Sequence, residues 1–227
     1  MKTLVSLTYD GGLLCHLETA LPQLQDNGLK GTFYCEPVPL LENLPEWAKA
    51  LQDGHEIGNG TLHGAVRQDG TLPGWTMEMV LDDVKEAKLL LQDLFPEQDE
   101  HTFGLPWGRP LSDGVDATPV VQQVYGTLRT GDSGLNKPPI DLARLKCVKC
   151  DAMTTEALIE LAETAHRESA WLIYAFEGVG SGERGVDEEV HRALCNWLAH
   201  DRRFETATVV GAAARVGAAA ARAAKLV

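Results

Sequence analysis

Short apolar runs alternate along the chain with longer stretches in which apolar residues recur every three or four positions. Runs of the first kind are typical of buried strands, and stretches of the second kind are typical of helices with one face in the core. The pattern predicts strands at 3–10, 30–35, 55–59, 101–105, 126–129, 170–176 and 204–210. It predicts helices at 13–26, 45–52, 76–94, 115–125, 154–167, 187–200 and 212–225.

Alternating strands and helices indicate a parallel sheet, either open or closed. The chain has 227 residues, of which 44% are hydrophobic, so it can bury a core of its own. No linker or change of composition divides it, and we expect one domain over residues 1–227. Pro22 lies inside the first helical stretch and should kink or split it.

The net charge of −13 argues against a general surface for nucleic acid or anionic membranes. No run reaches the length of a membrane span, and no signal-like segment precedes the first strand. We therefore expect a cytoplasmic protein with free thiols. Cys147 and Cys150 have the spacing of a zinc knuckle, but no second pair follows, which favours strand or loop cysteines. An acidic surface leaves self-association open.

Two carboxylates stand where predicted strands end. The first strand finishes in Asp10, followed by Gly11 and Gly12, and Glu177 follows the strand at 170–176. Ligands of α/β proteins usually bind at the carboxyl ends of the strands. The alternative for Asp10 is a solvated Asp-Gly turn.

Several segments, in this order, resemble the polysaccharide deacetylases (the NodB-homology domain, carbohydrate esterase family four). They are Ser6–Gly12, Gly28–Tyr34, Gly54–Asn59, Phe103–Gly108, Arg129–Gly131 and Trp171–Gly178. The resemblance covers almost the whole chain. It implies an α/β fold, a distorted (β/α) barrel of about seven parallel strands, close to the TIM-barrel plan.

The same resemblance implies that the metal site of the family is lost. Where the family has its catalytic Asp followed by a ligand Asp, this chain has Asp10 and Gly11. Where the family has two His ligands, this chain has Gly60 and Gly64, with His63 out of register. Because a hydrolytic zinc site needs three protein ligands, we expect no metal and no cofactor. The general-acid His of the last motif is replaced by Glu177.

The three glycines suggest a hypothesis in which the lost side chains leave space for a ligand. The alternatives are loss of function by drift and deliberate removal of the ligands. If the family geometry holds, Asp10 and Glu177 face each other across a pocket as base and acid. Alternatively, each is a structural carboxylate paired with Arg109, Arg129 or a backbone amide.

Six further residues are candidates to contact a ligand. Trp107 and Arg109 follow the strand at 101–105 and suit a planar, sugar-like or carboxylate-bearing molecule. Core packing is the alternative for Trp107, and a surface ion pair is the alternative for Arg109. The other candidates for the pocket lining are Tyr9, Asn59, Thr61 and His63.

A metal supplies several kcal/mol to the transition state of amide hydrolysis, so ordinary deacetylation is unattractive here. The sequence predicts a metal-independent acid–base enzyme of hydrolase, lyase or isomerase type, with Asp10 as base and Glu177 as acid. Its expected partner is a small polar or sugar-derived molecule, with no nucleic acid and no membrane. The alternatives are a catalytically silent ligand-binding protein, and a deacetylase whose metal site is rebuilt from Asp10, Glu36, His63 and Glu177.

Overall fold

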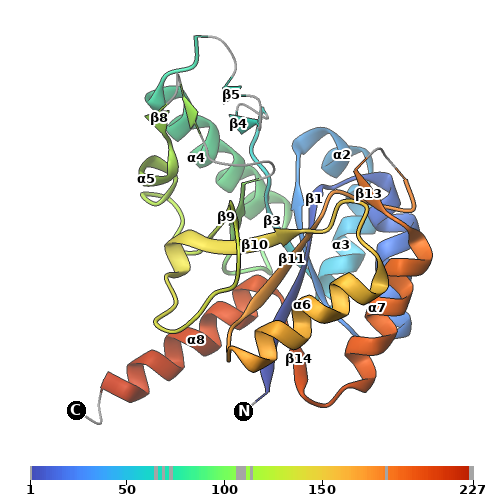
Figure 1. Ribbon diagram of the computed structural model, residues 1–227. Coiled ribbons are helices and arrows are strands. Elements are labelled where there is room, and N and C mark those ends of the chain that lie inside the picture. Colours follow the sequence, from blue (N-terminus) through green and yellow to red (C-terminus); the bar gives the residue numbers. More distant parts are fainter. Residues whose placement is uncertain are drawn as a thin grey trace.

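The strands form a ring with helices packed around its outside (Figure 1). The computed structural model describes residues 2–63, 66–67, 70–71, 74–105, 111–112, 115–181 and 184–224. Helices α4 and α5 cover one flank of the ring, α3, α6 and α7 cover the opposite flank, and α8 runs beneath it (Figure 1). In this part of the chain, no helix is both long and apolar enough to cross a membrane. None of the five cysteines forms a disulfide.

The ring is closed by parallel pairing of its first and last strands, β1 and β11. A further strand, β14 (Phe204–Thr206), pairs with the beginning of β1. The ring strands are, in spatial order, β1 (Thr3–Gly11), β2 (Gly31–Cys35), β3 (Glu56–Asn59), β6 (Phe103–Gly104), β9 (Leu128–Ser133), β10 (Leu145–Lys149) and β11 (Leu172–Phe176). This arrangement confirms the predicted α/β barrel.

Helices and short strands connect the ring strands. The helical segments are a π-helical turn η1 (His16–Ala20), α1 (Leu21–Asp26), α2 (Pro37–Glu42), α3 (Leu44–Gln52), α4 (Met77–Leu94), α5 (Thr118–Val121), a 3₁₀ turn η2 (Leu142–Arg144), α6 (Thr155–Arg167), α7 (Glu188–His200) and α8 (Val209–Ala224). The short strands are β4 (Val66–Arg67), β5 (Gly70–Thr71), β7 (Leu111–Ser112), β8 (Val115–Asp116), β12 (Gly178–Val179) and β13 (Gly185–Val186).

The break expected at Pro22 is confirmed, because the helix expected at 13–26 changes from the π-helical η1 to the α-helical α1 at Leu21, next to this proline. The structure corrects several other predicted elements. The helix expected at 115–125 is only four residues long. The strand expected at 204–210 ends at Thr206, and α8 begins at Val209 rather than at 212. Strand β10 and helix α2 were not predicted.

Successive side chains of a strand point to opposite sides, and β1 shows this clearly. Val5, Leu7 and Tyr9 belong to the apolar cluster shared with the surrounding helices. Ser6, Thr8 and Asp10 take the other side and face the interior of the barrel. The inner face of β1 is therefore polar and leads up to Asp10.

A buried polar group closes the lower end of the barrel. The Glu56 carboxylate accepts hydrogen bonds from the Thr32 hydroxyl at 2.8 Å, the Thr102 hydroxyl at 2.5 Å and the Val210 backbone N–H at 2.9 Å. Val210 lies in the first turn of α8, where the helix dipole favours a negative charge. These bonds fix α8 beneath β2 and β3.

Two glycines make room for the buried ring of Tyr34. A Cβ atom at Gly58 or at Gly104 would overlap this ring. We expect Gly104→Ala to lower the free energy of unfolding by about 1–3 kcal/mol, because the ring has to leave its place. Chemical denaturation measures this loss. Gly126→Ala is the matched control, since nothing lies within 4 Å of its added methyl group. Equal stability of the two variants would contradict this packing.

Candidate active site

The carboxyl ends of the ring strands meet at one end of the barrel, which we call the mouth. Tyr9 of β1 is paired with Phe176 of its parallel neighbour β11. The next residue on each strand is a carboxylate, Asp10 or Glu177. Ile173 and Ala175 face the barrel interior with Cys147, and Glu177 continues that alternation. Asp10 and Glu177 therefore lie at the same level on the inner face of neighbouring strands.

Asp10 forms a buried ion pair with Arg129 of β9. The distance from Arg129 Nη2 to Asp10 Oδ1 is 2.5 Å, and the side chains are 1% and 4% exposed. Burial raises the pKa of the Asp10 carboxyl, and the Arg129 guanidinium opposes that rise. The guanidinium also lies over the Tyr34 ring, 4.8 Å from its centroid. The pairing with Arg129 that the sequence left open is thus present, and it uses only one oxygen of Asp10.

Glu177 lies at the same level of the barrel as Asp10 but in a different environment. Burial raises the pKa of its carboxyl, and the negative charges of Asp151 and Asp10 raise it further, while Arg184 and Lys149 lower it. Its Oε2 atom is buried and has no hydrogen-bond partner among the described residues. A carboxyl in this environment keeps its proton to a higher pH than an exposed one, as a general acid requires.

His16 connects the loop after β1 with the end of β11. Its Nδ1 accepts from the Leu13 backbone N–H at 3.1 Å, and its Nε2 donates to the Glu177 carbonyl at 2.6 Å. Burial lowers the pKa of His16 to about 4, so the ring is neutral near pH 7. His16 lies in the π-helical turn η1, a feature often found at functional sites. It holds the backbone of Glu177 in place.

The positions of the family metal ligands do not fit a metal. Gly11, Gly60 and Gly64 carry no donor side chain, and Gly64 lies outside the described residues. A Cβ atom at Gly60 would lie 2.9 Å from the Tyr34 carbonyl oxygen and 3.0 Å from that of Cys35. The hypothesis that the glycines open space is therefore wrong at Gly60, because the backbone of β2 occupies it.

The rebuilt metal site is not supported either. Among the described residues, no three His, Cys, Asp or Glu side chains are grouped so that they could hold a metal ion. Asp10, Glu36, His63 and Glu177 are all described, and they do not form such a group. The described part of the chain therefore gives no metal a ligand set, and no step of the chemistry below uses one.

Two predicted ligand contacts are corrected by the alternation of side chains along the strands. The Tyr9 side chain is fully buried on the helix side of β1, and its hydroxyl bonds His191 Nε2 at 2.7 Å. Asn59 is 1% exposed and donates to the Tyr125 hydroxyl at 2.7 Å. Each points away from the barrel interior into which Asp10 projects. Tyr9 therefore holds α7 to the ring, and Asn59, whose amide also donates to the Val84 carbonyl at 3.4 Å, holds α4.

The remaining candidates are placed as follows. Thr61 is 1% exposed, and its backbone adopts a φ of 81°, which is strained for a β-branched residue. Its N–H donates to Asn59 Oδ1 at 2.7 Å. His63 follows at the rim, with a side chain that is 55% exposed. Trp107 and Arg109 lie outside the described residues.

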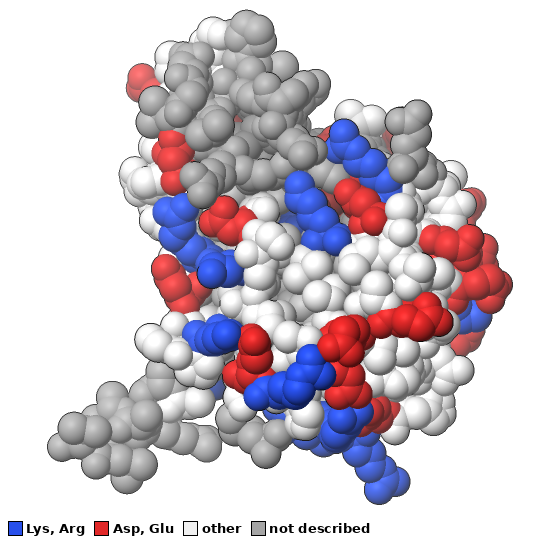
Figure 2. Space-filling view, in the orientation of Figure 1, with Lys and Arg blue, Asp and Glu red and all other residues white. Residues whose placement is uncertain are grey.

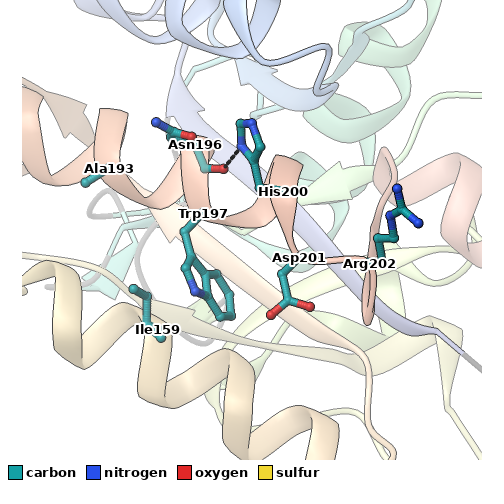
Figure 3. Close-up of a pocket in the computed structure, with 7 residues that line it drawn as sticks. All are labelled: Ile159, Ala193, Asn196, Trp197, His200, Asp201 and Arg202. Carbon is teal, nitrogen blue, oxygen red and sulfur yellow. Dashed lines mark hydrogen bonds between the residues drawn. The ribbon is translucent and has the colours of Figure 1, made fainter.

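The hollow drawn in Figure 3 is separate from the mouth. It has a volume of about 680 Å³ and lies between α6 and α7, where Trp197 points toward Ile159 (Figure 3). His200 Nδ1 bonds the Asn196 carbonyl of its own helix at 2.8 Å. None of the residues around Asp10 and Glu177 lines this hollow. Basic and acidic side chains are interleaved over the face with α6 and α7 (Figure 2).

The comparisons with known proteins agree with this fold. The sequence model of the polysaccharide deacetylase family matches residues 1–120. The chain belongs to this family. No curated protein is significantly similar to it in sequence.

Solved structures of the same fold include a putative deacetylase, the CE4 domain of a xylanase and a CE4 family pseudoenzyme. One is a putative polysaccharide deacetylase from Mycobacterium smegmatis, with 15% identity, a TM-score of 0.66, and coverage of 96% of this chain and 91% of that one. Another is the Xyl-CE4 domain of a xylanase from the hindgut metagenome of Trinervitermes trinervoides, with 12% identity, a TM-score of 0.61, and coverage of 96% and 92%. A third is a CE4 family pseudoenzyme from Bacillus anthracis, with 11% identity, a TM-score of 0.52, and coverage of 92% and 65%.

Three contributors to the site were missed or left open by sequence reasoning. Arg129 was only one of several options for pairing with Asp10, and His16 and Asp83, the partner of His63, were not identified at all. Asp83 could have been recognised from the sequence. It is a carboxylate at a position of α4 that the apolar periodicity assigns to the core, since Val80, Val84 and Ala87 share its buried face.

Proposed function

We propose that the chain is a metal-independent acid–base enzyme built on the deacetylase fold, acting on a small polar or sugar-derived molecule. One observation carries the proposal. Asp10 and Glu177 lie level on the inner face of adjacent strands at the mouth, and burial raises the pKa of both carboxyls. Two carboxylates with different environments are the usual way in which proteins assign a base and an acid.

The two environments support one assignment of the roles. The buried Arg129 keeps a positive charge against Asp10, which favours the ionised carboxylate and hence a base. Glu177 has an unpartnered buried oxygen among the described residues and the Asp10 charge beside it, which favours the protonated acid. Such a pair suits elimination, isomerisation, cyclisation or hydrolysis of a reactive bond. Positioned proton transfer contributes about 10²–10⁴-fold to such reactions.

The test is turnover in the presence of EDTA. Sugar lactones, unsaturated uronates, N-acetylglucosamine and 4-nitrophenyl acetate are the first substrates, with products followed by NMR. We expect turnover that EDTA leaves unchanged and that Asp10→Asn or Glu177→Gln lowers by about 10²-fold or more. Asp93→Asn, on the exposed face of α4, is the matched control and should keep the full rate. A rate that survives Asp10→Asn would exclude the proposed base.

A second candidate is a catalytically silent ligand-binding protein. Two observations favour it. The backbone of β2 occupies the space that a metal-binding side chain at position 60 would need, and Asp10 is almost completely buried. A CE4 family pseudoenzyme is among the solved structures of this fold, and a mutant of it is described as having restored enzymatic activity. This candidate predicts that a ligand found by the same screen binds Asp10→Asn as tightly as the unaltered protein.

A further inference from the structure

A buried carboxylate on α4 holds a histidine at the rim of the barrel. Asp83 is 2% exposed, and its Oδ1 lies 2.8 Å from Nδ1 of His63. The same carboxylate accepts from the backbone N–H groups of Leu62, at 3.2 Å, and of His63, at 2.8 Å. Three hydrogen bonds from two consecutive residues thus converge on one buried acid.

The two backbone bonds alone would fix the course of the loop after β3. The third bond does something more, because it selects the state of the imidazole ring. Nδ1 must carry the proton in order to donate to a carboxylate, so in the neutral ring the lone pair is on Nε2. The His63 side chain is 55% exposed, and the Trp75 ring lies against it at 5.7 Å between centroids. The loop thereby presents an oriented basic nitrogen.

The segment that carries this histidine is constrained at its start. Thr61 has a φ of 81°, and Asn59 bonds both the Thr61 N–H and the Tyr125 hydroxyl. Non-glycine residues with such a φ persist where the surrounding structure fixes them, often at functional sites. Because β3 lies beside β2 in the ring, its carboxyl end opens at the same mouth as Asp10.

We propose that His63, oriented by Asp83, is a third proton-transferring group of the mouth beside Asp10 and Glu177, for a ligand that carries an ionisable O–H, N–H or activated C–H group. This inference rests on the proposed function. Nε2 takes the proton of that group, the resulting imidazolium is balanced by the Asp83 carboxylate, and the proton returns to the product. His63 is the residue that contacts the ligand, and Asp83 is a positioning residue.

Acylation by diethyl pyrocarbonate tests the oriented nitrogen without any substrate, because this reagent attacks an unprotonated imidazole nitrogen. His200 is the internal control, since it is exposed and its Nδ1 bonds a backbone carbonyl instead of a carboxylate. Peptide mass spectrometry at pH 8, well above the ordinary pKa of histidine, measures the ratio of the two rates. We expect His63 to react about threefold faster or more, because the carboxylate bonded to Nδ1 makes Nε2 the stronger nucleophile. Asp83→Asn should bring the ratio close to 1.

Nitrogen NMR of the labelled protein supplies an independent readout. Unaltered His63 should show the proton on Nδ1, and Asp83→Asn should lose this preference, whereas an Asp83 that served only the two backbone N–H groups would leave it unchanged. A ratio near 1 in the unaltered protein, or an unchanged ratio in Asp83→Asn, would overturn the proposal.

The substrate screen separates this inference from the proposed function. If Asp10→Asn removes a turnover that His63→Gln leaves intact, the proton-transfer role of His63 fails and the proposed function stands. If both variants lose turnover by about tenfold or more, both ideas are supported. If turnover is unaffected by Asp10→Asn but lost in His63→Gln, the role of Asp10 fails and the Asp83–His63 pair carries the chemistry.

Discussion

Replacing Arg129 with methionine is expected to lower the free energy of unfolding by about 3–5 kcal/mol. Methionine keeps most of the apolar stem, but it leaves the Asp10 carboxylate buried without its counter-charge. It also removes the guanidinium that lies over the Tyr34 ring and donates to the Leu105 carbonyl at 3.3 Å. Guanidinium chloride denaturation at pH 7 measures the loss.

Two further variants make this result specific. Arg203→Met breaks ion pairs with Glu163 and Asp201 at the surface, where the arginine side chain is 45% exposed, so it should cost no more than about 1 kcal/mol. The double variant Asp10→Asn with Arg129→Met should recover part of the stability, because no buried charge is then left alone. A cost for Arg129→Met similar to that for Arg203→Met would mean that the buried pair does not stabilise the mouth.

Lowering the pH from 7.5 to 5 is expected to destabilise the protein through its buried histidines. Burial lowers the pKa of His16 to about 4 and that of His191 to about 3. A histidine with a depressed pKa stabilises the fold fully above its unfolded pKa of about 6.5, and this contribution is lost as the pH falls below that value towards its folded pKa. For His16 the whole loss amounts to roughly 3 kcal/mol.

The raised pKa values of Asp10 and Glu177 have the opposite effect on stability. As the pH falls, these carboxyls bind protons in the folded state before they would in the unfolded state, and this stabilises the fold. The carboxyls add this stability only near their own pKa range. That range lies at a lower pH than the one at which the histidines begin to destabilise the fold. Unfolding free energies measured by denaturant at several pH values should therefore already fall between pH 6.5 and 5. His191→Gln should reduce the slope of this decline by about one proton taken up on unfolding. A flat profile would contradict neutral, buried histidines.

Much of the fold could be predicted because the apolar periodicity is strong wherever a strand or helix is buried on one side. Strand β10 was not predicted because Lys146 and Lys149 interrupt its apolar pattern, and only Leu145 and Cys147 are well buried. Helix α2 has prolines at 37 and 39, which suggest a loop, although a proline in the first turn suits a helix. In both cases the tertiary environment decided the structure.

The site could be predicted only where neighbouring strands determine it. Asp10 and Glu177 end strands that prove to be neighbours in register, so their placement at one level follows from the barrel. Alternation along β1 and β3 could have excluded Tyr9 and Asn59 from the inner face. The contact of Arg129 with Asp10 spans 119 residues and that of His16 with Glu177 spans 161, so a single sequence could offer Arg129 only as one of several partners and gave no indication of His16.

Metal binding tests the central claim most directly, namely that carboxylate chemistry has replaced the metal site at the mouth. Purified protein would be analysed for bound metals and then titrated with zinc and cobalt, alongside Asp10→Asn and Glu177→Gln. The account predicts no stoichiometric binding that depends on either carboxylate. Tight one-to-one binding that is lost in both variants would contradict it and return the protein to metal-dependent hydrolysis.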